Sequence, residues 1–137
     1  MGAPHYMVAT SVHAVLAQRL VRLVCESCAE PQQPSDFEQR WLETQQRDGT
    51  GETRFQRGRG CSNCHGTGFR GRIGVYEMLE MSVELVRAAH RNDANLFTEV
   101  AKRQLEGRTL GRNAFRLAAE GRTTLEEAIR VASAQEE

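Results

Sequence analysis

Lysine is almost absent from this sequence, and its scarcity excludes one class of site at once. Lys102 is the only lysine among 18 basic residues, and no glycine-rich run precedes it. A phosphate-binding loop of the Gly-x-x-x-x-Gly-Lys-Ser/Thr type needs a lysine to reach the β- and γ-phosphates. The sequence therefore contains no such loop.

Other catalytic signatures are missing as well. The sequence has three aspartates, no Gly-x-Ser-x-Gly and no His-Glu-x-x-His, which excludes a nucleophile elbow and a zinc-protease helix. Its 18 acidic and 18 basic side chains cancel, which argues against a protein that mainly coats nucleic acid or an anionic membrane. Its apolar runs are short, so we expect no transmembrane helix. We predict no catalytic residue in this chain.

What remains is typical of a small globular protein. The 137 residues, 39% hydrophobic and 26% charged, suit one compact domain or two small ones. The opening Met-Gly-Ala-Pro-His-Tyr lacks the basic and apolar regions of an export signal. We therefore expect a cytoplasmic protein with reduced cysteines, for which paired Cys-x-x-Cys units favour a metal over disulfides.

The four cysteines form two such units, Cys25-Glu-Ser-Cys28 and Cys61-Ser-Asn-Cys64, separated by 32 residues. A two-residue spacer presents two thiolates to one ion, and two units complete the tetrahedral shell that zinc prefers. We predict a closed, structural Zn²⁺ site with these four ligands. We expect His65, which adjoins Cys64, to lie outside it. A redox pair or four free cysteines are the alternatives.

Apolar spacing and capping residues predict a largely helical chain around a small extended region. Ser35-Asp36-Phe37-Glu38 is a capping box, and Thr123 and Thr124 precede Glu126 and Glu127 at the start of the last helix. The expected helices cover residues 10–24, a short segment from 35, 82–91, 95 to before 107, 110–120, and a last one after 124; the expected extended segments are 53–57 and 72–79, and 48–51 is a flexible link.

Basic residues gather around the second cysteine pair. Residues 53–76 carry five arginines (at 54, 57, 59, 70 and 72) and no acid. This block is either a patch for acidic protein or nucleic acid, or a solvated face. Because a zinc centre with four thiolates carries two negative charges, it offsets part of the excess.

The segment from Cys61 to Glu77, Cys-x-x-Cys-x-Gly-Thr-Gly-Phe-x-Gly-Arg-x-Gly-Val-Tyr-Glu, closely resembles the tetracysteine region of the type II secretion and type IV pilus assembly ATPases. Ala14–Arg22, which leads into the first cysteine pair, and Gly121–Arg130 match the same family. Together they span about residues 2 to 131 of the sequence. The stretch from Asn92 to Arg116 looks most like the branch that serves mannose-sensitive haemagglutinin pili.

The resemblance implies a longer parent protein, a homo-hexamer of RecA-like cores at the cytoplasmic face of the inner membrane. ATP hydrolysis there, with Mg²⁺, would drive pilus or pseudopilus assembly through a membrane platform protein. This chain would be its C-terminal part: residues 1–24 end the ATPase core as a helix, 25–79 form the tetracysteine zinc-binding subdomain, and 80–137 form a helical subdomain. The expected fold is mostly α, with a small zinc-stabilised α+β subdomain and a terminal helical bundle.

Three functions follow as hypotheses. The leading one is a zinc-stabilised module, inactive alone, that packs against neighbouring subunits and docks to the platform protein, with no nucleic acid as a partner. Because the apolar stripe of helix 10–24 would lack its partner in the core, we expect either self-association or a repacked N-terminal helix. The alternative is an autonomous zinc ribbon that binds nucleic acid or unfolded protein, which the basic block favours. A redox enzyme that uses the cysteines is the third.

Overall fold

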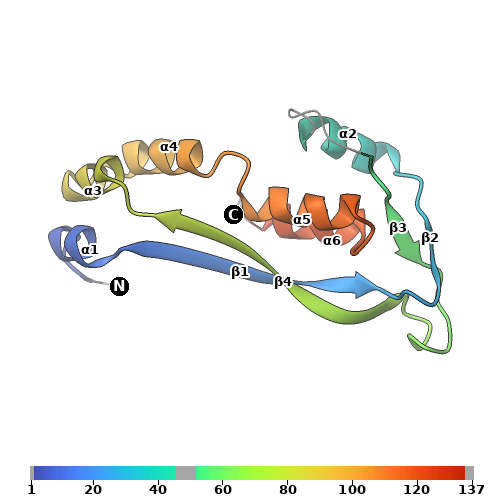
Figure 1. The fold of residues 1–137 in the computed structure, drawn as a ribbon. Helices are drawn as coiled ribbons and strands as arrows, with labels where there is room; N and C mark the ends of the chain where they lie inside the picture. Colours follow the sequence, from blue (N-terminus) through green and yellow to red (C-terminus); the bar gives the residue numbers. More distant parts are fainter. Residues whose placement is uncertain (1, 46–51, 135–137) are drawn as a thin grey trace. The chain divides into compact units, whose positions relative to one another are not determined.

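The computed structural model describes residues 2–45 and 52–134, which form six helices and two two-stranded sheets (Figure 1). The chain divides into two compact units: unit 1 contains residues 1–17 and 76–109, and unit 2 contains residues 18–75 and 110–137. In chain order the elements are α1 (His5–Ser11), β1 (Ala14–Val24), β2 (Ala29–Pro31), α2 (Asp36–Gln45), β3 (Gln56–Gly58), β4 (Phe69–Glu80), α3 (Val83–His90), α4 (Ala94–Gln104), α5 (Leu110–Ala119) and α6 (Leu125–Ser133).

The helix predicted over residues 10–24 is wrong, because most of this segment is the strand β1. It pairs with β4, and Figure 1 shows the two strands running in opposite directions along a twisted ribbon. A partner more than forty residues away thus overrides the local helical spacing, as tertiary context often does. Thr10 and Ser11, expected as N-caps, end the short helix α1. The apolar surface predicted to mediate self-association therefore lies on a strand and not on a helix. On this strand Val15 and Leu16 are 50% and 62% exposed.

Several predicted helix starts are confirmed. The Ser35 backbone N–H donates to Glu38 Oε2 at 2.8 Å, and the Glu38 N–H donates to Ser35 Oγ at 3.3 Å, which closes the capping box of α2. Ser82 Oγ caps α3 by accepting from the Leu85 N–H at 3.2 Å. These contacts are local, so a short sequence pattern is enough to specify them.

Other boundaries differ from the prediction or cannot be compared with it. The cap of α4 is Asp93, whose Oδ1 accepts from the Leu96 N–H at 3.0 Å, and not Asn95. The link predicted at 48–51 lies outside the described residues. The predicted predominance of helix is confirmed only in part, because the β1–β4 ribbon adds a long pair of strands to the small extended region.

Unit 1 has a small core formed where α3 packs against α1 and α4. The ends of β1 and β4 also join there, since the Met81 N–H donates to the His13 carbonyl at 2.9 Å. The buried apolar side chains of unit 1 are Ala9, Leu85, Ala88 and Val100.

Within residues 2–45 and 52–134, no helix has the length and apolar character that crossing a lipid bilayer requires.

Unit 2 has the larger core, in which α5 and α6 pack side by side and α2 contacts α6. Phe115 of α5 is 3% exposed. Its ring centroid lies 6.1 Å from that of Trp41 and 6.5 Å from that of Phe55. These aromatic contacts tie the segments on either side of residues 46–51 to the helical pair, and tilted rings at such distances attract one another.

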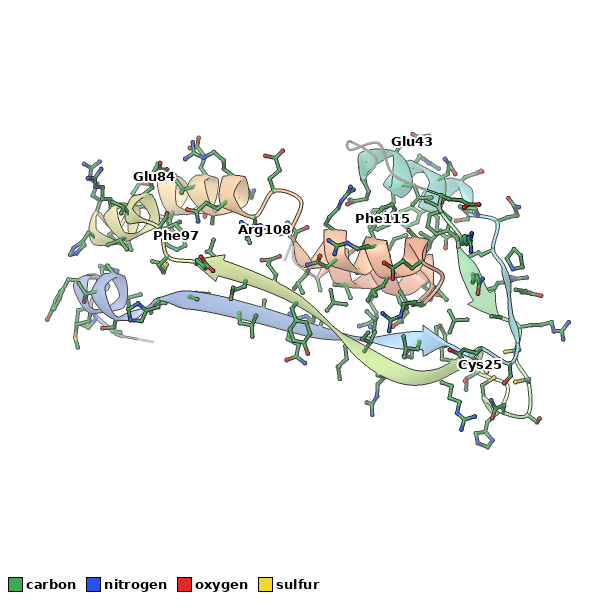
Figure 2. The ribbon with its side chains drawn as sticks, viewed as in Figure 1. Cys25, Glu43, Glu84, Phe97, Arg108 and Phe115 are labelled. Atoms are coloured by element: carbon green, nitrogen blue, oxygen red, sulfur yellow. The ribbon has the colours of Figure 1, made fainter. Side chains whose placement is uncertain are left out.

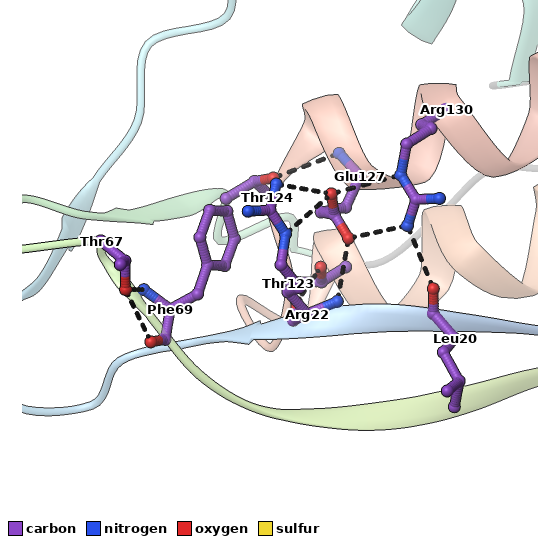
Figure 3. Close-up of polar contacts among 8 residues, drawn as sticks. All are labelled: Leu20, Arg22, Thr67, Phe69, Thr123, Thr124, Glu127 and Arg130. Carbon is purple, nitrogen blue, oxygen red and sulfur yellow. Dashed lines mark hydrogen bonds and ion pairs between the residues drawn. The ribbon is translucent and has the colours of Figure 1, made fainter. Parts of the chain in front are cut away.

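A buried carboxylate fastens β1 to α6 (Figure 3). Glu127 is 1% exposed, and its Oε2 accepts from the Arg22 backbone N–H at 2.9 Å. Its two oxygens also form ion pairs of 3.0 Å with the guanidinium groups of Arg22 and Arg130. The Arg130 guanidinium reaches on to the Leu20 carbonyl at 3.0 Å, and Thr123 Oγ1 donates to the Arg22 carbonyl at 2.7 Å.

This environment lowers the pKa of Glu127. Burial raises the pKa, but hydrogen bonds from Arg130 and Arg22 lower it more, so it falls from 4.5 to about 2. A first-turn position had suggested an ordinary capping acid, and Thr124 Oγ1 does cap α6 by accepting from the Glu127 N–H at 3.2 Å. The carboxylate of Glu127 itself, however, binds Arg22 of the neighbouring strand β1.

Because the folded-state pKa of Glu127 is lowered, its contribution to stability is present above about pH 4.5 and is lost as the pH falls towards 2. We expect Glu127→Gln to lower the free energy of unfolding by about 3 kcal/mol near neutral pH and by less than about 1 kcal/mol near pH 2. Urea unfolding of the wild-type protein and of Glu127→Gln over this pH range measures the difference between their free energies of unfolding. Other titrating groups affect both proteins equally and cancel in this difference. Glu126→Gln, at the exposed neighbouring position, is the control and should change little; a pH-independent deficit in Glu127→Gln would refute this role.

Candidate metal centre

The ends of strands in unit 2 place the four cysteines. Cys25 follows β1, Cys28 precedes β2, and Cys61 and Cys64 lie in the turns between β3 and β4. Figure 2 shows sulfur atoms gathered around the labelled Cys25, where β1 leads into the first turn. We call the turns 25–28 and 61–64 the two knuckles.

Pairing of β2 with β3 brings the two knuckles together. The strands are antiparallel, with Ala29 opposite Gly58, and the ladder continues towards the cysteines because the Arg59 N–H donates to the Cys28 carbonyl at 3.1 Å. On the other side, the Cys25 N–H donates to the Gly68 carbonyl at 2.9 Å. Backbone hydrogen bonds therefore hold both knuckles, although their cysteines are more than thirty residues apart.

The sulfur atoms have the spacing of a tetrahedral ligand set. All four Sγ atoms lie within 4.8 Å of one another. The Sγ–Sγ distances are 3.8 Å for Cys25–Cys61, 3.8 Å for Cys28–Cys64 and 3.7 Å for Cys61–Cys64. Metal–sulfur bonds of about 2.3 Å give a regular tetrahedron edges of about 3.8 Å, whereas a disulfide would need about 2.05 Å. The donor set thus fits one metal ion such as zinc.

Backbone N–H groups point at two of the sulfurs. Cys28 Sγ accepts from the Gly60 N–H at 3.3 Å. Cys64 Sγ accepts from the Cys61 N–H at 3.3 Å and from the Gly68 N–H at 3.2 Å. Such donors stabilise the thiolate form, which is the form that binds metal.

The pKa values of Cys28 and Cys64 are shifted in opposite directions. Burial raises the pKa of Cys64, but the Cys61 and Gly68 N–H groups lower it more, to about 6. The Gly60 N–H lowers the pKa of Cys28, but burial and the neighbouring sulfurs raise it more, to about 11. One sulfur is thus readily ionised while its neighbour retains a proton, because adjacent thiolates repel. A divalent cation at the centre would remove that repulsion and favour deprotonation of all four.

The cluster is shielded from solvent. Cys25, Cys28 and Cys64 are 0%, 7% and 4% exposed, and Cys61 is partly buried. His65 is exposed and adopts a positive φ of 55°, as suits a residue in the turn that follows the second knuckle. The structure therefore places the four predicted cysteines together and His65 at the surface.

A close backbone contact behind the knuckles was not predicted. A Cβ atom at Gly58 would lie 2.0 Å from the Gly68 carbonyl oxygen, and one at Gly68 would lie 2.5 Å from the Gly58 oxygen. The two glycines, at the end of β3 and just before β4, thus let the strands approach closely enough for the sulfurs to meet. No sequence pattern pairs Gly58 with Gly68.

The arginines of the basic block are exposed. Side chains at 54, 57, 59, 70 and 72 all face solvent. Arg57 pairs with Glu30 at 3.0 Å across the β2–β3 sheet, and Arg54 pairs with Glu52 at 3.2 Å. Part of the block is therefore neutralised locally and forms a solvated face.

The Gly58–Gly68 contact gives a prediction for metal affinity. Gly58→Ala should weaken zinc binding at least tenfold, about 1.4 kcal/mol, because the new methyl group separates the strands that carry the knuckles. Gly66→Ala is the matched control, since Gly66 has a φ of +78° but nothing within 4 Å of a Cβ, so it should suffer turn strain without overlap. Competition with a chromogenic chelator measures both affinities; equal affinities would show that the close approach is unimportant.

Comparison with known proteins gives clear relatives. The profile of the family described as "Type II/IV secretion system protein" matches residues 1–130. "Type II secretion system protein E" of Pseudomonas aeruginosa is 33% identical over 131 residues, covering 96% of this chain and 25% of that protein. The protein of the same name from Pectobacterium carotovorum is 36% identical over 134 residues, with coverages of 96% and 25%.

A pilus protein matches over the same region. "Type IV pilus assembly ATPase PilB" of Thermus thermophilus is 34% identical over 135 residues, covering 94% of this chain and 14% of that protein. The chain thus spans 25% or less of the length of these three relatives. The family match over nearly the whole sequence confirms the resemblance seen in the cysteine and glycine motifs: the chain belongs to the type II/IV secretion system protein family.

Proposed function

We propose that Cys25, Cys28, Cys61 and Cys64 hold a structural zinc ion. The observation that carries this proposal is the clustering of the four Sγ atoms within 4.8 Å, with three of the distances at 3.7–3.8 Å, which suits four bonds to one tetrahedral ion. When bound, zinc would supply on the order of 10 kcal/mol of folding free energy. Four protein ligands leave no position for a reacting water, so the role is structural and not catalytic.

We further propose that the chain is the C-terminal part of a longer ATPase that powers pilus or pseudopilus assembly. Support comes from relatives of which this chain covers a quarter or less, one of them named a pilus assembly ATPase, and from the lack of a phosphate-binding loop in this sequence. ATP and Mg²⁺ would bind to other parts of that parent. In this proposal residues 25–79 are its zinc-binding subdomain, between the end of the core and a helical subdomain. Assignment to the haemagglutinin-pilus branch stays a prediction.

The role proposed for this part is packing against neighbouring subunits of a hexamer and docking to the platform protein at the inner membrane. The knuckles would give it a rigid contact surface, because a metal fixes two turns that otherwise depend on short strands. The zinc-ribbon alternative is supported by the exposed arginines, but Arg54 and Arg57 already have acidic partners. Binding to an oligonucleotide with a steep salt dependence would favour that alternative.

Metal removal tests the zinc proposal. We expect about one zinc ion per purified chain, and a loss of at least about 10 °C in Tm after treatment with a chelator, because the knuckles lose their cross-link. Cys28→Ser should reproduce this loss, whereas Ser62→Ala, at an exposed spacer position, should retain the metal. Elemental analysis and thermal unfolding provide the measurements, and an unchanged Tm after complete metal removal would falsify the structural role.

The docking proposal has its own test. The zinc-loaded chain should bind the cytoplasmic domain of the cognate platform protein in biolayer interferometry, and the metal-stripped chain should bind at least about tenfold more weakly, since its contact surface is no longer fixed. The cytoplasmic domain of an unrelated inner-membrane protein serves as the control. Equal binding by the zinc-loaded and metal-stripped chains would show that docking does not depend on the metal.

A further inference from the structure

A cleft of about 610 Å³ lies beside the cysteine cluster within unit 2. This volume is in the usual range of ligand-binding pockets. Its walls come from the end of β1, both knuckles, the start of β4 and the turn between α5 and α6. We call it the knuckle cleft, and the lining residues that matter are Val24, Glu26, Ser27, Asn63, Arg70 and Arg122.

The two knuckles position one arginine of the cleft. Asn63 Nδ2 donates to Ser27 Oγ at 2.8 Å, which joins the spacer residues of the two Cys-x-x-Cys units. The Arg70 guanidinium donates to Asn63 Oδ1. Because Ser27 Oγ accepts the amide hydrogen, its own hydroxyl hydrogen is available to a ligand.

The turn between the two helices positions the second arginine. The Arg122 N–H donates to the Leu117 carbonyl at 3.0 Å, and the Arg122 carbonyl accepts from the Val24 N–H at 2.9 Å. Its side chain is exposed. Among the described residues, no carboxylate forms an ion pair with Arg122 or Arg70.

Cationic side chains outnumber acidic ones among the residues that line the cleft. Arg70, Arg122 and the Ser27 hydroxyl can all donate, and Glu26 supplies the one acidic side chain among the lining residues. Leu23, Val24 and Ala29 add apolar surface. This combination complements a carboxylate carried next to apolar groups, because a guanidinium binds a carboxylate through paired hydrogen bonds.

The charge of the metal centre narrows the class of ligand. A zinc ion held by four thiolates, as proposed above, would leave two negative charges close to the cleft, and Glu26 adds a third. A phosphate dianion would be repelled more strongly than a single carboxylate. We propose that the knuckle cleft binds an acidic peptide segment of the platform protein, with the carboxylate held between Arg70 and Arg122; this inference rests on the docking function proposed above.

Fluorescence anisotropy with the zinc-loaded 137-residue chain tests the proposal. The probe is a fluorescein-labelled peptide with an amidated C-terminus, Ala-Leu-Gln-Glu-Leu-Ala, and its counterpart with glutamine in place of the glutamate measures the contribution of the single carboxylate. The glutamate peptide should bind at least about tenfold more tightly. Arg122→Gln should remove most of this preference. Glu26→Gln should raise the affinity severalfold, a gain that misfolding cannot produce.

Arg72→Gln is the matched control, because Arg72 is an exposed arginine of the same strand as Arg70 but does not line the cleft. It should change the affinity less than about twofold. Zinc content and Tm are measured for every variant. Equal binding of the two peptides, equal losses in Arg72→Gln and Arg122→Gln, or tighter Arg122-dependent binding of a single-stranded oligonucleotide would each overturn the proposal.

The same variants distinguish this inference from the docking function. If the platform domain binds and Arg122→Gln has no effect on that binding, docking stands and the knuckle cleft is not its site. If the acidic peptide binds through Arg122 and the platform domain does not bind at all, the cleft stands as a carboxylate site and the partner assignment is wrong.

Discussion

The meeting of four sulfur atoms from two distant segments is the constraint on which unit 2 depends. The first knuckle lies between β1 and β2, and the second lies between β3 and β4. A change that separates the sulfurs therefore also separates these strands. In the described residues between 29 and 60, the regular elements are the three-residue strands β2 and β3 and the helix α2. Short strands of this kind are marginal in water without a further cross-link. The sheet positions the sulfurs, and a metal ion bound by all four, as proposed above, would supply such a cross-link.

A second, independent anchor holds the same strand. Glu127 binds the backbone and guanidinium of Arg22, three residues before the first cysteine. The Arg22 guanidinium also stacks over Phe69, with its carbon 4.1 Å from the ring centroid. Because Phe69 begins β4 and follows the second knuckle, this one arginine connects α6, β1 and β4. The walls of the knuckle cleft are thus fixed by the cysteine cluster on one side and by the α6 anchor on the other.

The helix caps show where sequence reasoning succeeds. The capping box at Ser35 and Glu38 and the cap at Ser82 form between residues three apart, and both are present. The end of α5 also has a local cause, since Gly121 adopts a φ of +78° just beyond it, as glycine often does after a helix. A Cβ atom at Gly121 would lie 2.8 Å from the Arg54 carbonyl oxygen, a reason for glycine that depends on a segment far away in the sequence and could not be predicted.

The sequence by itself determined the cysteine pairs, the caps of α2 and α3, and the family, because each depends on residues that lie close together along the chain. Only the tertiary structure decided that residues 14–24 form a strand, that Gly58 and Gly68 touch, and that Glu127 serves Arg22. Local spacing favours a helix where Leu16, Leu20 and Leu23 recur, but hydrogen bonds to β4 satisfy the same backbone and leave Val21 and Val24 buried. Contacts between distant segments leave no local periodicity, so the physical reason for them appears only when the chain is folded.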